Sequence, residues 1–296
     1  MKQAKFRKKY GHLLFIGPHL ILFLVFTIIP LIFGIYIAFT NWNLIGIPEF
    51  VGLKNFKTIL FDKDSTFYTQ FWNGMINTLK FVVMAVPTSI AVPFAISVAI
   101  NTKEIKGQSL FQSIFYLPGL FSISAVGIIF AMLFNPQLGV ANALFNNDVM
   151  WLREQPYAWL AILITSIWWG IGGNMVIYIA AIAGVDKGLY EAAAIDGAGV
   201  LGKFWYITLP SIRYQILYTL VMTVTASFNI YGQPLMLTNG GPNSSTKVLM
   251  MYIRELAFGK GDSLAGLGSA MALMLGIVIM VISLAQFKFL DFNKEG

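Results

Sequence analysis

The sequence has no cysteine, and charged residues occupy only 11% of its 296 positions. Without cysteine, the chain can form neither a disulfide framework nor a thiolate metal or redox site. Soluble domains carry roughly 25% charged residues, so this chain has too few to cover its own surface. We therefore expect an integral membrane protein. The net charge of +7 does not indicate nucleic-acid binding, because Lys and Arg in membrane proteins mostly record topology.

Six apolar stretches account for most of the chain. A hydrocarbon core of about 30 Å needs ~20 apolar residues for a helix to cross it, and the first stretch runs from the end of the amino-terminal tail to Thr40. Between the first two stretches, residues 41–72 are polar and mixed with aromatics, as suits an interfacial loop. The other five stretches lie at about 81–100, 110–134, 158–185, 212–235 and 267–287.

The distribution of cations predicts the orientation. The amino-terminal segment MKQAKFRKKYGH contains five cations and no acid, and the apolar run after it lacks the small-residue cleavage pattern of a signal peptide. With the amino end inside and six spans, 12 of the 20 Lys and Arg residues lie on the cytoplasmic side, in agreement with the positive-inside rule. We predict a basic cytoplasmic tail at 1–12, a membrane domain at 13–296 and a cytoplasmic carboxyl end.

The six stretches contain no Asp, Glu, Lys or Arg in their interiors. Carriers driven by protons or sodium usually place ionisable groups or unwound backbone at mid-membrane. His19, near the cytoplasmic end of the first stretch, has no visible partner, so we interpret it as an interfacial or packed side chain. A self-sufficient secondary carrier or channel remains the alternative function, and the uncharged spans disfavour it.

Residues 197–203, GAGVLGK, match GxGxxG and the beginning of the phosphate-loop pattern. A phosphate loop also needs a preceding strand, and a Ser or Thr after the Lys to hold magnesium. Here the helix-prone segment EAAAID precedes, and Phe204 follows Lys203, so we interpret the match as accidental. No paired carboxylates, metal-ligand cluster or nucleophile–base pair is visible in the sequence. We predict no catalytic residue, no metal site and no enzyme activity, which also disfavours a multispan membrane enzyme.

The segment YEAAAIDGAGVLGKFWYITLPS, residues 190–211, carries a longer pattern. Glu191-Ala192-Ala193, Gly197 and Ile207-Thr208-Leu209-Pro210 match EAA-x3-G-x9-I-x-L-P at every defined position. This pattern resembles the EAA loop of the permease subunits of binding-protein-dependent ABC importers. Three further segments resemble the carbohydrate-importing branch of that family, of the maltose, glycerol-3-phosphate and multiple-sugar type. They are FVGLKNF at 50–56, FYLP at 115–118 and YGQPLMLTNGGP at 231–242. A minor departure is Val185-Asp186, where many relatives carry Ile-Pro.

The resemblance implies an all-α membrane protein with the six-helix type I ABC importer permease fold, placed in the bacterial cytoplasmic membrane. It implies three kinds of partner: a second homologous permease, an ATPase dimer and an extracellular sugar-binding protein. ATP and magnesium would be bound by the ATPase subunits, and this chain itself would need no cofactor. The loop at 186–211 would couple ATP hydrolysis to transport through Glu191, Ala192, Ala193, Asp196, Gly197, Leu209 and Pro210.

The loop residues suit such a contact. Leu189, Ala193 and Asp196 recur at i, i+4 and i+7, so they share one face of a short helix, and small Ala side chains permit close approach. We expect Gly197 and Gly199 to end this helix and Pro210 to open the fifth span, where a missing N–H is tolerated.

Two spans carry polar or small residues on one face. In the fourth span these residues recur at i, i+3, i+4 and i+7 with an asparagine beside them, and the fifth span has an equivalent face. An aromatic plane next to glycines suits a pyranose ring. The candidate pathway residues are Ser166, Trp169, Gly170, Gly173, Asn174, Thr223, Ser227, Asn229 and Ile230.

By the resemblance, the fourth-span positions correspond to sugar-contacting positions of the maltose-type family, although only Trp168 and Gly170 keep the residue type there. The alternative is that glycine and hydroxyl residues simply pack the spans together, above all Gly172 and Gly173. Substrate contacts could also lie mostly in the partner permease. In the third span we interpret Tyr116 and Pro118 as a kink.

Overall fold

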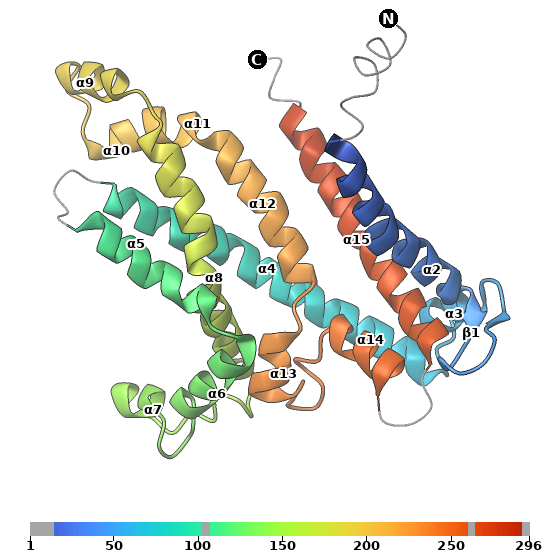
Figure 1. The fold of residues 1–296 in the computed structure, drawn as a ribbon. Helices are drawn as coiled ribbons and strands as arrows, with labels where there is room; N and C mark the ends of the chain where they lie inside the picture. The colour runs from blue at the N-terminus through green and yellow to red at the C-terminus, as the bar shows by residue number, and fades with distance from the viewer. Residues whose placement is uncertain (1–14, 102–106, 260–263, 292–296) are drawn as a thin grey trace, which may run out of the picture. The chain divides into compact units, whose positions relative to one another are not determined.

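The computed structural model describes residues 15–101, 107–259 and 264–291, so the predicted basic tail at 1–12 lies outside the described residues. The described chain is mostly helical (Figure 1), which confirms the predicted all-α class. Its one exception is a pair of two-residue strands, β1 (Thr40–Asn41) and β2 (Glu49–Phe50). They pair antiparallel, with Thr40 opposite Phe50.

The chain divides into two compact units, one of residues 1–71 and 252–274 and the other of residues 72–251 and 275–296. We call them unit 1 and unit 2. Unit 1 contains η1 (Leu24–Ile28), α2 (Ile29–Ala38), the strands and α3 (Lys54–Leu60). Unit 2 contains α5 (Gln108–Tyr116), η2 (Leu117–Leu120), α6 (Ile123–Leu133), α7 (Val140–Phe145), α8 (Tyr157–Ala183), α9 (Lys187–Ile195), α10 (Val200–Lys203), η3 (Phe204–Thr208), α11 (Leu209–Ser211), α12 (Arg213–Phe228) and α13 (Gly232–Thr238). Three helices run through both: α4 (Thr66–Ile100), α14 (Leu249–Phe258) and α15 (Ala265–Asp291).

Four helices of the described chain are long and apolar enough to cross a membrane. They are Phe15–Ala38, α4, α8 and residues Ala265–Lys288 of α15. A fifth candidate is the pair Gln108–Leu120 and Ile123–Leu133, which is bent by 100°. The kink predicted at Tyr116 and Pro118 is therefore a complete break, in which η2 follows α5 and the chain turns before α6.

The predicted fifth stretch, 212–235, is also interrupted. Helix α12 ends at Phe228 and α13 begins at Gly232, so neither piece is long enough to qualify as a span by itself. The number of six spans and the cytoplasmic placement of both chain ends stay predictions.

Helix α4 begins at Thr66, well before the predicted start near residue 81. The added turns contain polar residues, which is why the sequence suggested a loop. In the structure, tertiary hydrogen bonds satisfy the polar side chains of these turns. The Asn77 amide donates to the backbone oxygens of Ser244 at 2.9 Å and Lys247 at 3.1 Å. The Thr78 hydroxyl accepts the N–H of Leu249 at 3.0 Å. Buried polar groups with such partners cost little, so the helix continues.

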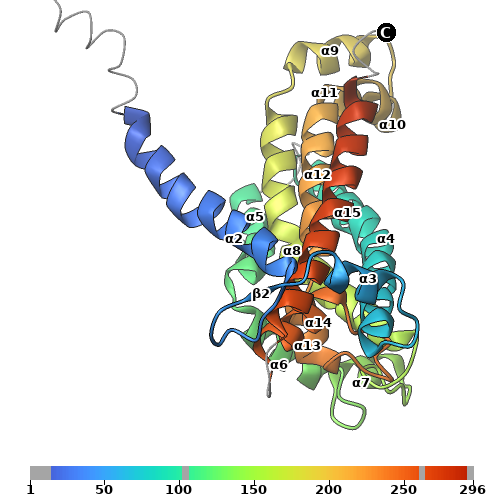
Figure 2. The same cartoon turned by 90° about the vertical axis from the view of Figure 1, so that its right-hand side faces the viewer.

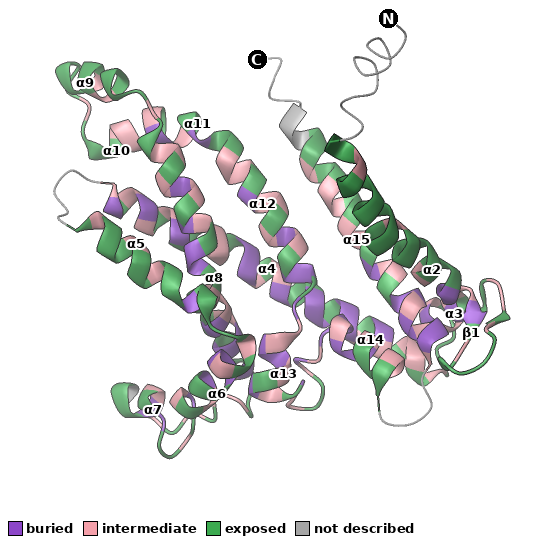
Figure 3. Ribbon diagram, in the orientation of Figure 1, coloured by how far each residue is buried: buried purple, intermediate pink, exposed green. Residues whose placement is uncertain are grey.

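Apolar side chains remain exposed along the candidate spans (Figure 3), most clearly along α2. Only 6% of the most apolar window of Phe15–Ala38 is buried within the chain. A helix that is apolar on all sides is normally buried in a core or in a membrane. The exposed surface is therefore the part that lipid or a partner subunit covers.

The core of unit 2 lies where α4, α6, α8 and α13 meet, and includes Phe81, Val126, Phe130, Ile162 and Leu237. Around this core, α8 and α12 connect two ends of the unit (Figures 1 and 2). At one end they join α9, α10 and α11, and at the other they lie near α6 and α13.

Candidate functional site

The loop between α8 and α12 is built from short, locally capped pieces. Helix α9 begins after Asp186, whose carboxylate accepts the N–H of Gly188 at 2.8 Å. It ends at Ile195 in a Schellman motif, in which the N–H of Ala198 donates to the oxygen of Ala193 at 2.8 Å. Gly197 has the left-handed φ of +78° that this motif requires. The prediction that glycines end the helix is confirmed for Gly197 and wrong for Gly199, which has a φ of −72° and precedes α10.

Most predicted coupling residues lie on this exposed loop. Glu191, Ala192 and Asp196 are exposed, and Ala193 is half-buried. Asp196 follows the last helical residue and so extends the α9 face rather than belonging to it. The GAGVLGK segment follows helix α9 rather than a strand. A phosphate loop would follow a strand, so the structure agrees with the interpretation that this match is accidental.

Leu209 and Pro210 lie further along, in the short helix α11. The prediction that Pro210 opens the fifth span is wrong by three residues, since α12 begins at Arg213. The physical reason is that the π-helical turn η3 leads into α11, and the chain breaks at the buried Ile212 before α12 starts.

A hydrogen bond between hydroxyl groups closes the loop. Tyr190 of α9 and Thr208 of η3 lie 2.9 Å apart, oxygen to oxygen. Beside them, the ring of Phe204 packs against Phe94 of α4, with centroids 5.7 Å apart. The two arms of the loop are therefore joined to each other and to the helical body of unit 2.

The loop also presents large apolar side chains to solvent. Ile195, Val200 and Tyr206 are each 85% exposed or more. They were absent from the sequence prediction, although their apolar character in a loop between two spans was a usable signal. Exposed apolar groups gathered on one segment are typical of a protein–protein contact.

A cavity of about 560 Å³ opens among the helices of unit 2. Its lining comes from α4, α6, α8, α12 and α13, and from the link between the last two. All nine residues that the sequence suggested for a substrate pathway line this cavity: Ser166, Trp169, Gly170, Gly173, Asn174, Thr223, Ser227, Asn229 and Ile230. The structure therefore brings the two predicted faces together, while their contact with a substrate stays a prediction.

Hydrogen bonds between helices hold the cavity wall in place. The Asn174 amide of α8 donates to the backbone oxygen of Ser89 in α4 at 2.9 Å and to the Thr223 hydroxyl of α12 at 3.1 Å. The indole N–H of Trp169 donates to the backbone oxygen of Phe121 at 3.0 Å. This bond fixes the indole in one orientation. Its neighbour Trp168 does not line the cavity and packs on Phe130 instead, with ring centroids 5.2 Å apart.

The glycines of α8 divide into two kinds. A Cβ atom at Gly172 would lie 2.7 Å from the Cα of Tyr116, so this glycine is needed for close packing of α8 on α5. A Cβ atom at Gly170 or Gly173 would meet nothing within 4 Å. The packing interpretation therefore holds for Gly172, whereas Gly173 leaves open space in the cavity.

Several residues outside the predicted pathway set also line the cavity, among them Ser89, Tyr231 and Gln233. Ser89 is one of three hydroxyl residues, with Thr88 and Ser97, in an otherwise apolar span, and this was a usable signal. Tyr231 and Gln233, which the sequence places near the fifth-span face, lie where the fifth stretch is interrupted, and the structure shows that this interruption faces the cavity.

The chemistry of the lining is uncharged. Among the described residues that form it, none is Asp, Glu, Lys, Arg or His. Hydroxyls, amides and an indole can exchange hydrogen bonds and stacking contacts with a neutral polar ligand. The described part of the chain also contains no group of three or more His, Cys, Asp or Glu residues placed to hold a metal ion.

The amino-acid sequence is similar to those of known transport permeases. The chain is 33% identical to the "Probable starch degradation products transport system permease protein AmyD" of Thermoanaerobacterium thermosulfurigenes, over 96% of each chain. It is 30% identical to the "Arabinooligosaccharides transport system permease protein AraP" of Bacillus subtilis, over 98% of this chain and 92% of the relative.

A solved structure shares the fold. It is described as a bacterial ABC transporter involved in the import of the acidic polysaccharide alginate, and it superposes with a TM-score of 0.81 at 24% identity over 98% of each chain. With its apolar helices, the present chain is a multi-pass membrane protein. Its role is that of a membrane component of a transport system and not of an enzyme. Residues 71–292 match the family model "Binding-protein-dependent transport system inner membrane component", and the chain therefore belongs to this family.

Proposed function

We propose that the chain is a permease subunit of an ATP-driven importer of carbohydrate in the bacterial cytoplasmic membrane, where it forms half of the translocation pathway. The observation that carries this proposal is the continuity between loop and cavity. Helix α8 carries Trp169 and Asn174 and leads into the loop, and the loop leads through α11 and Ile212 into α12, which carries Thr223.

The distances favour mechanical coupling. Asn174 lies nine residues before the end of α8, which is roughly 14 Å at a rise of 1.5 Å per residue. Thr223 lies ten residues after the start of α12, or roughly 15 Å. Helical segments of this length move as nearly rigid bodies. A displacement of the loop is therefore passed to both cavity walls.

In the proposed assembly, the chain pairs with a second homologous permease, and an ATPase dimer binds the exposed loop. The ATPase subunits bind ATP and magnesium, and their closure moves the loops of both permeases. An extracellular binding protein delivers the ligand. The family description supports dependence on a binding protein. The printed names of the relatives, which mention starch degradation products and arabinooligosaccharides, support a carbohydrate ligand.

Reconstitution tests the proposal. Proteoliposomes that contain the chain with its partner permease and ATPase should accumulate radiolabelled oligosaccharide only when ATP and the binding protein are both supplied. Vesicles with this chain alone should show no uptake. Uptake by the chain alone without ATP would instead identify a self-sufficient carrier or channel.

A further inference from the structure

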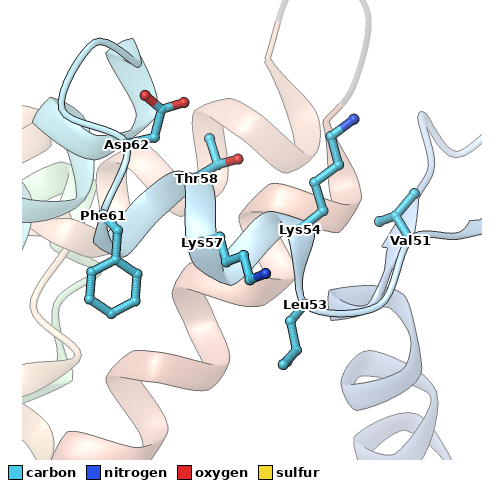
Figure 4. A pocket seen from close by; sticks show the side chains of 7 residues that line it. All are labelled: Val51, Leu53, Lys54, Lys57, Thr58, Phe61 and Asp62. Atoms are coloured by element: carbon cyan, nitrogen blue, oxygen red, sulfur yellow. The ribbon is translucent and has the colours of Figure 1, made fainter.

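A second hollow, of about 520 Å³, lies on the connection between the first two spanning helices, within unit 1 (Figure 4). It has no part in the proposed transport pathway, which lies in unit 2. Its lining comes from the start, body and end of α3: Val51, Leu53, Lys54, Lys57, Thr58, Phe61 and Asp62.

Helix α3 is fixed to the end of the first span. The Asn55 amide donates to the backbone oxygens of Ala38 at 2.9 Å and Thr40 at 2.8 Å. The ring of Phe56 packs against Phe39, with centroids 5.1 Å apart, and Ile59 is fully buried. These contacts hold α3 at the level where the span Phe15–Ala38 ends, so its outward face lies at the membrane surface.

The outward face combines apolar and cationic side chains. Leu53, Lys57 and Phe61 recur at i, i+4 and i+8, and Figure 4 shows the Lys57 side chain between the two apolar ones. Leu53 is 59% exposed and Phe61 is 75% exposed. Side chains of this kind are stable where apolar groups contact acyl chains and a lysine reaches the headgroups.

The rest of the connection supports a lipid environment. Ile45, Ile47 and Phe50, which precede α3, are also strongly exposed. Both ends of the connection continue into spanning helices, Phe15–Ala38 and α4. Apolar groups tethered in this way at the bilayer surface are within reach of lipid.

The net charge of the hollow favours a negatively charged lipid headgroup. Lys54 and Lys57 supply two positive charges and Asp62 one negative charge, so the lining has a formal net charge of +1. The two lysines lie at i and i+3, on neighbouring positions of the helix surface. We propose that this hollow binds the headgroup of an anionic glycerophospholipid, with its phosphodiester at Lys57 and its headgroup hydroxyls near Thr58 and Asp62, on the side of α3 to which Lys54 also points (Figure 4). Leu53 and Phe61 then enter the acyl boundary.

The first experiment measures the depth of residue 61 in the bilayer. Because this chain contains no cysteine, the variant chain has a single labelling site and is labelled before it is assembled with its partners. A Phe61→Cys variant of the assembled complex carries an environment-sensitive fluorophore in vesicles of phosphatidylglycerol and phosphatidylethanolamine. We expect quenching by lipids spin-labelled near the glycerol backbone. The matched control is Lys63→Cys, an exposed position outside the hollow, and it should be quenched less. Equal quenching at both positions, or none at Phe61→Cys, would overturn the proposal.

The second experiment tests the headgroup. Phosphatidylglycerol added to the delipidated complex in detergent should raise its unfolding midpoint, as any ligand of the folded state does. Because each lysine near an anionic surface contributes about 1 kcal/mol, the Lys54→Gln/Lys57→Gln variant should need roughly thirtyfold more lipid for the same shift. The Lys63→Gln control should behave as the parent protein.

Phosphatidylcholine and inorganic phosphate serve as competing probes in the same assay. Both should leave the midpoint unchanged at concentrations where phosphatidylglycerol acts. An equal shift with either probe, or an unaltered lipid response of the double variant, would refute the assigned headgroup. Lys54, Lys57 and Lys63 are exposed and lie outside the transport machinery. ATP hydrolysis stimulated by the binding protein should therefore persist in Lys54→Gln/Lys57→Gln and in Lys63→Gln.

Discussion

The loop and the cavity of unit 2 share two helices but are stabilised in different ways. The loop is organised by bonds between near neighbours, such as the contact from Ala198 to Ala193. The cavity depends on bonds between distant parts of the chain, since Asn174 reaches residues 85 and 49 positions away. Because the loop bonds are local, loop substitutions should alter the coupling of ATP hydrolysis to transport without unfolding the protein. Substitutions in the cavity wall should instead alter stability or ligand affinity.

The largest expected effect comes from the two adjacent glycines of α8. Gly172→Ala places a Cβ atom 2.7 Å from the Tyr116 backbone, and such overpacking costs about 1–3 kcal/mol. Gly173→Ala meets nothing within 4 Å and should be neutral or stabilising, because alanine favours helix by about 1 kcal/mol. Thermal unfolding of the purified complex measures both. Equal destabilisation of the two variants would contradict the division between packing and cavity glycines.

The next effect concerns the loop. Gly197→Ala forces a Cβ atom into the left-handed region, at a cost of about 1–2 kcal/mol, and should displace the end of α9. ATP hydrolysis should continue while oligosaccharide uptake falls severalfold, and the unfolding midpoint should fall less than in Gly172→Ala, because the strain is confined to an exposed loop. Gly199→Ala is the matched control, because its φ is −72° and its Cβ atom would meet nothing within 4 Å. A normal ratio of uptake to hydrolysis in Gly197→Ala would show that the loop does not couple the two.

A smaller effect should follow removal of the cavity indole. Trp169→Ala should weaken the apparent oligosaccharide affinity by roughly two- to tenfold, in line with the 0.5–1.5 kcal/mol typical of aromatic contacts. Trp168→Ala removes a similar ring that packs on Phe130 outside the cavity, so it should leave affinity unchanged. Transport assays over a range of ligand concentrations distinguish the two. The reverse pattern would place the pathway on the other side of α8.

The smallest effect is expected at the bond that closes the loop. Tyr190→Phe and Thr208→Val each remove one hydroxyl of a 2.9 Å pair, and a net hydrogen bond contributes about 1 kcal/mol. Each change should lower coupled uptake modestly. The double variant should lose no more than Thr208→Val alone, because both single changes remove the bond between the two hydroxyls and only Thr208→Val also removes the bond from the Thr208 hydroxyl to the backbone oxygen of Lys203 at 3.4 Å. Additive losses in this double-mutant cycle would mean that the two hydroxyls act separately.

Features that depend on local patterns could be predicted from the sequence. The stop of α9 at Gly197 follows from a short motif, and the cavity face of α8 follows from helical periodicity, since Ser166, Trp169 and Gly173 project to one side. Neither inference needs knowledge of the rest of the chain. To predict which residues of the other helices line the cavity, the tertiary arrangement of those helices must be known.

Features that depend on tertiary partners could not be predicted. The early start of α4 rests on bonds from Asn77 and Thr78 to a segment about 170 residues away. The distinction between Gly172 and Gly173 exists only because Tyr116 lies against one of them. The break before α13 matters because the cavity opens there, and a hydropathy pattern contains no such information.

The interruptions after Leu120 and Phe228 have a consequence for biogenesis. A nascent helix enters the bilayer on its own when about 20 apolar residues are continuous, a length that α4, α8 and α15 reach. The pieces of 108–133 and 213–238 are shorter, and their freed backbone groups need protein neighbours in lipid. We expect these two segments to integrate late, after α4 and α8 offer them partners, so that the parts that shape the cavity are also the last to settle in the membrane.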